Sequence, residues 1–180
     1  MRPNNATESG FTLIELIIAM TLMVITAGIL ASIIAVNFDV LANVSERKKL
    51  VTRGMLAVNL FERELGMLVD STNIAIADDQ QLRFVDKYAN TWEYSVSTSN
   101  FTRQQVGVGS ALTLATPVIN ADTKFKYFDG SNAELTSLPL STTNRKLVRL
   151  VKLMLVMDDG SDGIPLMSIV YPENMKIYNK

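Results

Sequence analysis

The sequence contains no cysteine and no histidine among its 180 residues. Without cysteine there are no disulfides, thiolate metal ligands or cysteine nucleophiles, and without histidine there are no imidazole ligands or Ser-His-Asp arrangements. No Gly-x-Ser-x-Gly motif is present either. A cysteine-free chain is compatible with either redox compartment. We therefore expect no enzyme and no cofactor, and the compartment has to be inferred from other features.

An excess of charge of either sign is also absent. The formal net charge is −1, from 17 basic and 18 acidic residues. Removing residues 1–10 takes away Arg2 and Glu8 and leaves 16 basic and 17 acidic residues, so the remaining chain is also at −1. Domains that bind nucleic acid usually have a strongly basic balance. Nucleic acid is therefore not an expected partner.

The longest feature that is present is an uncharged, apolar run. The 21 residues from Leu16 to Val36 contain no charged side chain. As a helix with a rise of about 1.5 Å per residue, they span roughly 31 Å, which matches a bilayer core of about 30 Å. The alternative is a buried core helix, but no face of this run is polar. We predict a transmembrane helix over residues 11–36.

The ten residues before this helix are short, polar and end in Gly10. A secretory signal peptide has its apolar region before a small-residue cleavage site. Here the apolar run follows the small residue, so the order is reversed. Residues 1–10 therefore form a different kind of leader.

Glu15 is the one charge close to the apolar run. It follows Phe11 by four residues and lies on the same helical face. A carboxylate that enters a bilayer costs a few kcal/mol unless it is paired, so an acid there is a candidate functional residue. The alternative is a helix-start residue whose side chain reaches the lipid headgroups.

The segment Gly10-Phe11-Thr12-Leu13-Ile14-Glu15, followed by about twenty apolar residues, resembles the N-terminal motif of type IV pilins and type II secretion pseudopilins. The resemblance implies a prepilin peptidase that cuts after Gly10 and methylates the new N-terminal Phe11. It also implies that Glu15 acts in assembly, by pairing with the ammonium of a neighbouring subunit. The expected fold is α+β, with a long N-terminal helix packed on an antiparallel β-sheet.

The same resemblance implies a location and partners. The leader would be cytoplasmic, the helix would cross the bacterial inner membrane once, and the remaining domain would lie in the periplasm before it joins a pilus or pseudopilus. The partners would be prepilin peptidase, membrane lipid and other pilins or pseudopilins. Two departures are the single basic residue of the leader, Arg2, and the lack of the mid-helix proline common in major pilins. The second departure favours a minor subunit.

Residues 37–73 are amphipathic and are predicted to continue the same helix to about residue 69. Gly54 and Gly66 lower the helix propensity without ending the pattern. Packing on a sheet is favoured over a coiled coil, because the apolar spacing lasts only about four heptads. The predicted apolar stripe consists of Leu41, Val44, Val51, Met55, Val58, Leu65 and Val69, with Glu64 off it.

Residues 74–180 contain short alternating runs separated by turns, which is typical of an antiparallel sheet. A polar stretch over 131–144 is predicted to be a loop. The segment 145–157 also fits a helical stripe, but a strand is favoured because a glycine-rich turn and another apolar run follow it. The predicted strands are 81–85, 91–97, 100–105, 124–128, 147–157 and 164–171.

Several segments of this domain resemble particular minor subunits. The segment 60–65, with sequence LFEREL, is similar to one near the helix end in pseudopilin J and the minor pilin W. The strands around Trp92, Phe101, Tyr127 and Leu150 follow in a similar order.

Two polar clusters are candidate sites. The loop 158–163 holds three carboxylates, Asp158, Asp159 and Asp162, which could bind calcium or simply form a tight turn; the turn is favoured. The basic residues Arg145, Lys146, Arg149 and Lys152 could bind phosphate, as in a competence pilin that contacts DNA. Protection of a sheet edge by charge is the favoured interpretation of that cluster.

Three classes of protein therefore remain: a filament subunit, a membrane-anchored enzyme and a solitary anchored binding domain. The absent nucleophile motifs disfavour the enzyme. Only a filament subunit requires the cut after Gly10, so that class is favoured.

Overall fold

A computed structural model describes residues 12–172 of the chain. Helix α1 runs from Leu13 to Gly66. The chain divides into two compact units, Met1–Glu46 and Arg47–Lys180, and α1 contributes to both. The long N-terminal helix packs on antiparallel β-structure, so the predicted α+β fold, consistent with a pilin fold, is confirmed.

The second unit contains two antiparallel sheets. A short 3₁₀ turn η1, Ser71–Asn73, leads from the helix into the first sheet, whose strand order is β1-β2-β3-β4-β5, and the second sheet has the order β6-β7-β8. A four-residue helix α2 lies at Thr142–Arg145. The strands are β1 Ile74–Ala77, β2 Gln81–Val85, β3 Thr91–Ser97, β4 Asn100–Gln105, β5 Val108–Ala115, β6 Lys124–Phe128, β7 Leu150–Met157 and β8 Ile164–Val170.

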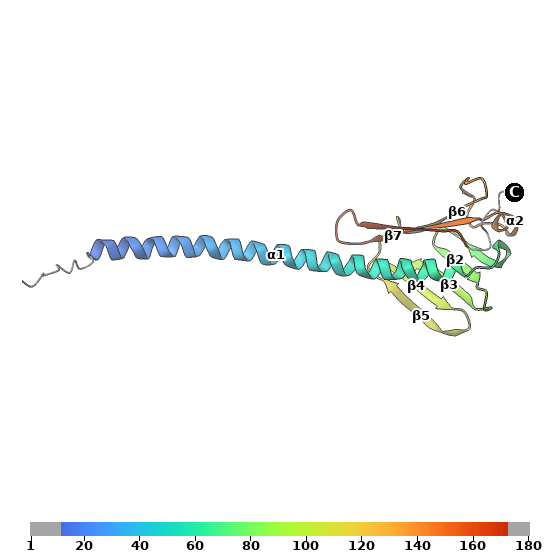
Figure 1. The fold of residues 1–180 in the computed structure, drawn as a ribbon, viewed down its shortest axis with the longest axis horizontal. Helices are drawn as coiled ribbons and strands as arrows, with labels where there is room; N and C mark the ends of the chain where they lie inside the picture. Colours follow the sequence, from blue (N-terminus) through green and yellow to red (C-terminus); the bar gives the residue numbers. More distant parts are fainter. Residues whose placement is uncertain (1–11, 173–180) are drawn as a thin grey trace, which may run out of the picture. The chain divides into compact units, whose positions relative to one another are not determined.

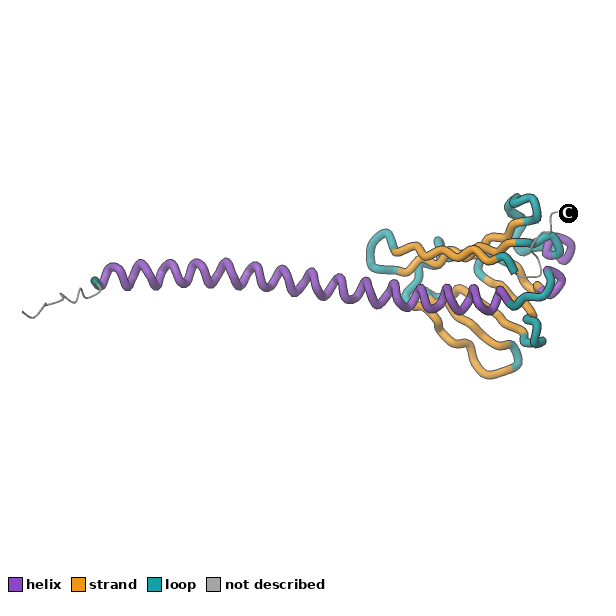
Figure 2. The backbone as a smooth tube through the Cα atoms, in the orientation of Figure 1, coloured by secondary structure: helices purple, strands orange, loops and turns teal. Residues whose placement is uncertain are grey.

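Residues 47–66 of α1 lie between the two sheets, with β4 and β5 on one side and β7 on the other (Figure 1). The same arrangement is seen along the backbone (Figure 2). Phe61 has no exposed surface and packs edge-on to Tyr94 of the first sheet, with ring centroids 5.2 Å apart. It also lies 5.7 Å from Phe125 of the second sheet. One aromatic side chain of the helix therefore joins both sheets in a single core.

The buried face of α1 differs from the predicted stripe. Val58 and Leu65 are buried as expected, but Met55 is 54% exposed. The expectation that Glu64 lies off the buried face is wrong, since it is only 3% exposed. The predicted stripe also lacked Phe61, which lies between Val58 and Leu65 on the buried face of the helix. The buried residues of α1 are Gly54, Ala57, Val58, Phe61, Glu64 and Leu65, at steps of three and four.

Gly54 allows the closest approach between α1 and the second sheet. A Cβ atom at this position would collide with the side chain of Leu166 and would lie 3.1 Å from the Met157 side chain. A larger residue would therefore require the Leu166 side chain to move or the helix to shift. This packing explains why a residue of low helix propensity occupies the middle of a helix.

The predicted strands agree well with the observed ones where side chains alternate. In β3, Trp92, Tyr94 and Val96 are buried and the residues between them are partly exposed, as predicted. The strand predicted over 147–157 is confirmed for Leu150–Met157, and Arg145 instead ends the short helix α2. The predicted hairpin over 158–163 is confirmed by the pairing of Met157 with Ile164. Two strands, β1 and β5, were not predicted.

The role of α1 in the core leads to a prediction about fragments. A fragment that begins at Arg47 should fold without detergent and unfold cooperatively. A fragment that begins at Ile74 loses the buried helix side chains and should aggregate or melt roughly 10 °C or more lower, because each lost kcal/mol lowers the Tm by about 2–8 °C. Circular dichroism melts of both fragments measure this. Equal melting temperatures would show that the helix does not contribute to the core.

Candidate functional site

The N-terminus of α1 is capped by reciprocal hydrogen bonds between Thr12 and Glu15. The Thr12 backbone N–H donates to Glu15 Oε2 at 3.0 Å, and the Thr12 hydroxyl donates to the same oxygen at 2.8 Å. The Glu15 N–H donates in turn to Thr12 Oγ1 at 3.4 Å. This pattern is a capping box, in which a Thr-x-x-Glu sequence satisfies N–H groups that the first helical turn leaves free. The Thr12-x-x-Glu15 spacing could have been recognised in the sequence and was not.

The capping box gives Glu15 a local role beside the one predicted in assembly. Its carboxylate fixes the first turn of the helix at the edge of the apolar run. Gly10 and Phe11, the predicted cleavage and methylation residues, lie outside the described residues.

The polar side chains in the apolar part of α1 form hydrogen bonds within the helix itself. Residues 12–46 are all exposed, and α1 is long and apolar enough to cross a membrane. Between Leu16 and Asn37, every polar side chain donates a hydrogen bond to the carbonyl four residues earlier. These bonds are Thr21 to Ile17 at 2.7 Å, Thr26 to Leu22 at 2.7 Å, Ser32 to Gly28 at 3.1 Å and Asn37 to Ile33 at 2.7 Å.

In a bilayer there is no water to satisfy a hydroxyl or an amide, and each unsatisfied group costs several kcal/mol. The four hydrogen bonds within α1 remove most of that cost. The segment is therefore suited to a water-free environment although it contains polar residues.

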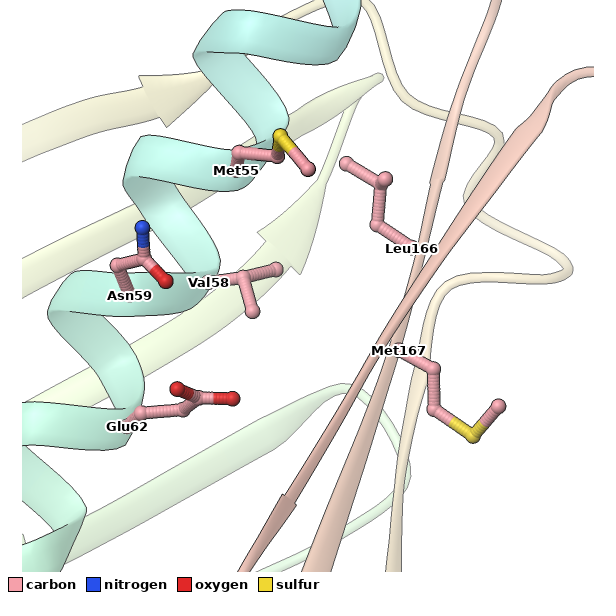
Figure 3. A pocket seen from close by; sticks show the side chains of 6 residues that line it. All are labelled: Met55, Val58, Asn59, Glu62, Leu166 and Met167. Carbon is pink, nitrogen blue, oxygen red and sulfur yellow. The ribbon is translucent and has the colours of Figure 1, made fainter.

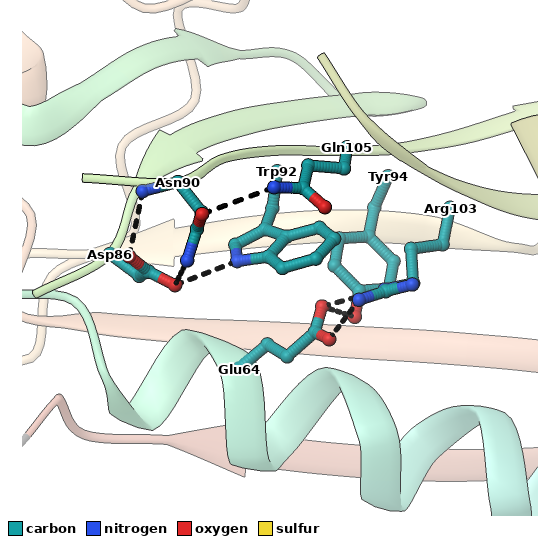
Figure 4. Close-up of polar contacts among 7 residues, drawn as sticks. All are labelled: Glu64, Asp86, Asn90, Trp92, Tyr94, Arg103 and Gln105. Atoms are coloured by element: carbon teal, nitrogen blue, oxygen red, sulfur yellow. Dashed lines mark hydrogen bonds and ion pairs between the residues drawn. The ribbon is translucent and has the colours of Figure 1, made fainter. Parts of the chain in front are cut away.

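Glu64 is the centre of a buried polar network that joins α1 to the first sheet (Figure 4). Its Oε2 accepts hydrogen bonds from the Tyr94 hydroxyl at 2.6 Å and from Arg103 Nε at 2.9 Å. Arg103 Nη2 donates to the other carboxylate oxygen, so the ion pair is bidentate. The Glu64 side chain is 4% exposed and that of Arg103 is 20% exposed. A buried charge with this geometry is fully compensated.

The network continues from Arg103 to the loop between β2 and β3. The Arg103 guanidinium lies over the Trp92 ring, 3.8 Å from its centroid. Trp92 Nε1 donates to Asp86 Oδ2 at 2.9 Å, and Asp86 also accepts from the backbone N–H of Asn90 at 2.9 Å. The strands β3 and β4 therefore hold one face of α1 through a continuous set of polar contacts.

The pKa values of this network follow from burial and charge. Burial, together with the hydrogen bond to the Glu64 carboxylate, raises the pKa of the Tyr94 hydroxyl, so it stays a neutral donor. Burial acts to lower the pKa of Arg103, but the Glu64 carboxylate outweighs it and the pKa is raised. With both pKa values raised, the Tyr94 hydroxyl stays protonated and the Arg103 guanidinium stays charged at neutral pH.

The three aspartates of the 158–163 loop are used in different ways. Asp159 Oδ1 accepts from the Ser161 hydroxyl at 2.7 Å, and its Oδ2 lies 3.5 Å from Arg47 Nη2. Asp158 Oδ1 accepts from the N–H of Gly160 at 2.9 Å. No group of three acidic side chains suited to a metal ion occurs among residues 12–172, and Asp162 does not join the other two in one. The loop is held by the turn contacts that aspartate and glycine typically make.

The basic cluster is divided between structural contacts. Arg149 Nη1 donates to Ser71 Oγ at 3.1 Å and to the Lys146 carbonyl at 3.0 Å. Arg145 Nη1 donates to the Leu140 carbonyl at 3.3 Å. The expected protection of a sheet edge is wrong, because Lys152 lies on β7, the central strand of its sheet. The two arginines instead bind backbone carbonyls and the Ser71 hydroxyl, so they are held by structural contacts.

Two shallow grooves flank the exposed side of α1. The first lies between α1 and β8 and is lined by Met55, Val58, Asn59, Glu62, Leu166 and Met167, with a volume of about 220 Å³ (Figure 3). The second lies between α1 and β5, has a volume of about 490 Å³, and is lined by Leu56, Ala57, Asn59, Leu60, Arg63 and Leu114. Both are open and mainly apolar, which suits contact with another protein surface more than binding of a small polar ligand.

Comparison with known families gives one match. Residues 5–31 match the model of the prokaryotic N-terminal methylation motif. The match includes Gly10, Phe11 and Glu15 and most of the uncharged run, and it supports a precursor like those of type IV pilins and pseudopilins. The motif implies processing by prepilin peptidase and assembly with other pilins. Comparison of the whole chain with curated proteins finds no match.

The Glu64 network gives a prediction about stability. Glu64→Ala leaves the Arg103 guanidinium partly buried without its carboxylate and should cost about 3–5 kcal/mol in the free energy of unfolding. Glu62→Ala removes an exposed acid from the same helix turn and should change it by less than about 0.5 kcal/mol. Urea denaturation of the 47–180 fragment measures both. A similar loss in the two variants would contradict the central role of the ion pair.

Proposed function

We propose that this chain is a minor pilin or pseudopilin subunit. It is inserted in the inner membrane through residues 11–36, cut after Gly10, and joined to a type IV pilus or a type II secretion pseudopilus, near the tip. The methylation motif at residues 5–31 carries this proposal. It is supported by a helix that begins at Leu13, three residues after Gly10. Polar side chains in the uncharged run of this helix donate hydrogen bonds to carbonyls of the same helix.

The proposal divides the chain into four parts. Residues 1–10 are the cytoplasmic leader, 11–36 the membrane segment, 37–73 the amphipathic continuation and 74–180 the periplasmic domain. The 47–66 part of α1 belongs to the core of that domain, since it supplies Phe61 and Leu65. A subunit of this kind needs no active site, and its only covalent chemistry is performed on it by the peptidase.

The particular subunit type we propose is that of pseudopilin J or the minor pilin W. The lack of a proline within residues 11–36 supports a minor subunit. The segment 60–65 contains Phe61 and Glu64, so the part of the sequence that resembles those subunits also holds the helix against both sheets. The engaged arginines of the basic cluster give no support to a role in DNA uptake.

The cut after Gly10 is tested by mass. The assembled protein should begin with N-methyl-Phe11, and its intact mass should lack residues 1–10. Gly10→Val should leave an uncut precursor in the membrane, because a branched side chain obstructs the peptidase at the cut. Ser9→Ala, next to it, is the control and should be processed normally. Assembled filaments that still contain residues 1–10 would refute the proposal.

The role of Glu15 is tested by separating its charge from its hydrogen bonds. Glu15→Gln keeps a side chain that can complete the capping box, whereas Glu15→Ala does not. If the carboxylate pairs with the Phe11 ammonium of a neighbouring subunit, both variants should lose assembly by roughly 1–3 kcal/mol, the cost of leaving a charge unpaired. Processing after Gly10 should continue in both variants.

The measurement is co-purification with partner subunits, with membrane insertion as the control. Normal assembly of Glu15→Gln together with failure of Glu15→Ala would show that the cap, and not the charge, is required. Loss of insertion in either variant would assign Glu15 to topology.

A further inference from the structure

Strand β5 is an uncovered edge of the first sheet. It pairs with β4 on one side, and residues 108–113 are exposed on both faces of the strand. Val108 is 61% exposed and Leu112 is 57% exposed. Within residues 12–172, β5 makes no backbone–backbone hydrogen bond apart from its ladder with β4, and near its start the Gly109 carbonyl accepts from the Gln104 side chain at 3.2 Å. The outer N–H and C=O groups of the rest of the strand are therefore free to pair with another strand.

Two of the other three sheet edges of the described chain are covered by backbone contacts. The carbonyl of Ala77 on β1 accepts from the N–H of Leu140 at 2.8 Å, and that of Tyr127 on β6 accepts from the N–H of Leu135 at 2.8 Å. The third, β8, has Pro165 near its start, which has no N–H to donate. β5 contains no proline, and the sequence from Gln104 to Ala121 has no charged residue. Within residues 12–172, β5 is thus the edge with neither charge, proline nor covering backbone.

The free edge of β5 borders the second groove. Leu114 lines that groove with Leu56 and Leu60 of α1. Leu112 pairs with Arg103 in the ladder, and Arg103 reaches Glu64 of the helix, so Leu112 lies on the face of the sheet toward α1. A strand added to β5 would place alternate side chains over Leu56 and Leu60 and would fill the groove. The edge and the groove therefore form one surface.

We propose that β5 docks an extended segment of another pilin-type subunit, which adds to the first sheet as a sixth strand. This inference rests on the proposed function as a filament subunit. Only another strand can satisfy the free backbone groups, and the uncharged β5 favours a segment with apolar side chains at alternate positions. Arg63 is the one charged residue that lines the groove, and it forms no ion pair within the described residues. An acidic side chain near the end of the segment would complement it.

A second copy of this chain fits the edge poorly. Antiparallel pairing of β5 with itself requires a two-fold axis perpendicular to the sheet, and that operation reverses the direction of residues 47–66 in the second copy. Subunits anchored in one membrane through the same N-terminal segment enter a filament with the same polarity. A different subunit can instead present a strand that runs antiparallel to β5 without reversing its own helix.

The test uses the full chain in the cells that express its partner subunits. A photoreactive benzoylphenylalanine is placed at Leu112, and a matched control is placed at Ile169 of β8, which is 51% exposed. Irradiation should link position 112 to a different chain that has the Gly-Phe-x-x-x-Glu N-terminal motif, through an uncharged segment identified by peptide mass. The control should give this product at least about tenfold less. Leu112→Lys should reduce co-purification with the same chain about tenfold, whereas Ile169→Lys should not.

Two further measurements make the outcomes distinct. Intact mass reports the cut after Gly10, and thermal melting shows that Leu112→Lys and Ile169→Lys fold equally well. If the chain is cut and assembled but position 112 links only to its own copies, to lipid or to nothing, the docking inference is overturned and the proposed function stands. If the chain stays uncut and unassembled, the proposed function fails, and the docking inference fails with it.

Discussion

The helix α1 satisfies its polar groups in two different ways, and the rest of the structure depends on how it does so. In residues 16–37 the hydroxyls and the amide bind carbonyls of the same helix, as an apolar surrounding would require. In residues 47–66 the buried carboxylate of Glu64 is satisfied by side chains of β3 and β4. The first solution needs only the helix, whereas the second requires a folded sheet.

The ion pair between Glu64 and Arg103 explains why the helix adopts one position on the sheet. A shift of α1 by one turn would exchange buried side chains of different size, such as Ala57 and Phe61. The same shift would separate the buried carboxylate from the guanidinium and leave both uncompensated, at a cost of several kcal/mol. Phe61 supplies burial against both sheets, and the ion pair selects the register. The glycine at position 54 then permits the close approach to Leu166 that this register brings.

The sequence allowed prediction of the features that depend on local patterns. Alternation identified β2, β3, β4 and β6, and the segment from Gly10 to Glu15 with its apolar run identified the methylation motif. The leader and the membrane segment stay predictions. The strand β5 was missed because Gly107 and Gly109, both with positive φ, interrupt its start, and because its side chains are exposed on both faces and so do not alternate. The strand β1 has only four residues, too few for alternation to be recognised.

Features that depend on contacts between distant residues could not be predicted in this way. A charged residue in an amphipathic helix is normally solvated, and nothing near Glu64 in the sequence indicates that Arg103, 39 residues later, neutralises it. The same limit applied to Arg149 of the basic cluster, which donates to the Ser71 hydroxyl 78 residues earlier. The capping box at Thr12 and Glu15 is different, because its spacing is local and could have been recognised.

The unprotected edge of β5 bears on the choice between a filament subunit and a solitary anchored domain. For a domain that works alone, an uncharged and uncovered strand is a risk of aggregation, and substitutions to lysine or proline would remove that risk at little cost to the fold. The chain covers the edges of β1 and β6 through Leu140 and Leu135, so such protection is compatible with this fold. A filament subunit, in contrast, gains from one edge that stays open to a partner. The open edge of β5 therefore fits the proposed filament subunit better than a domain that works alone.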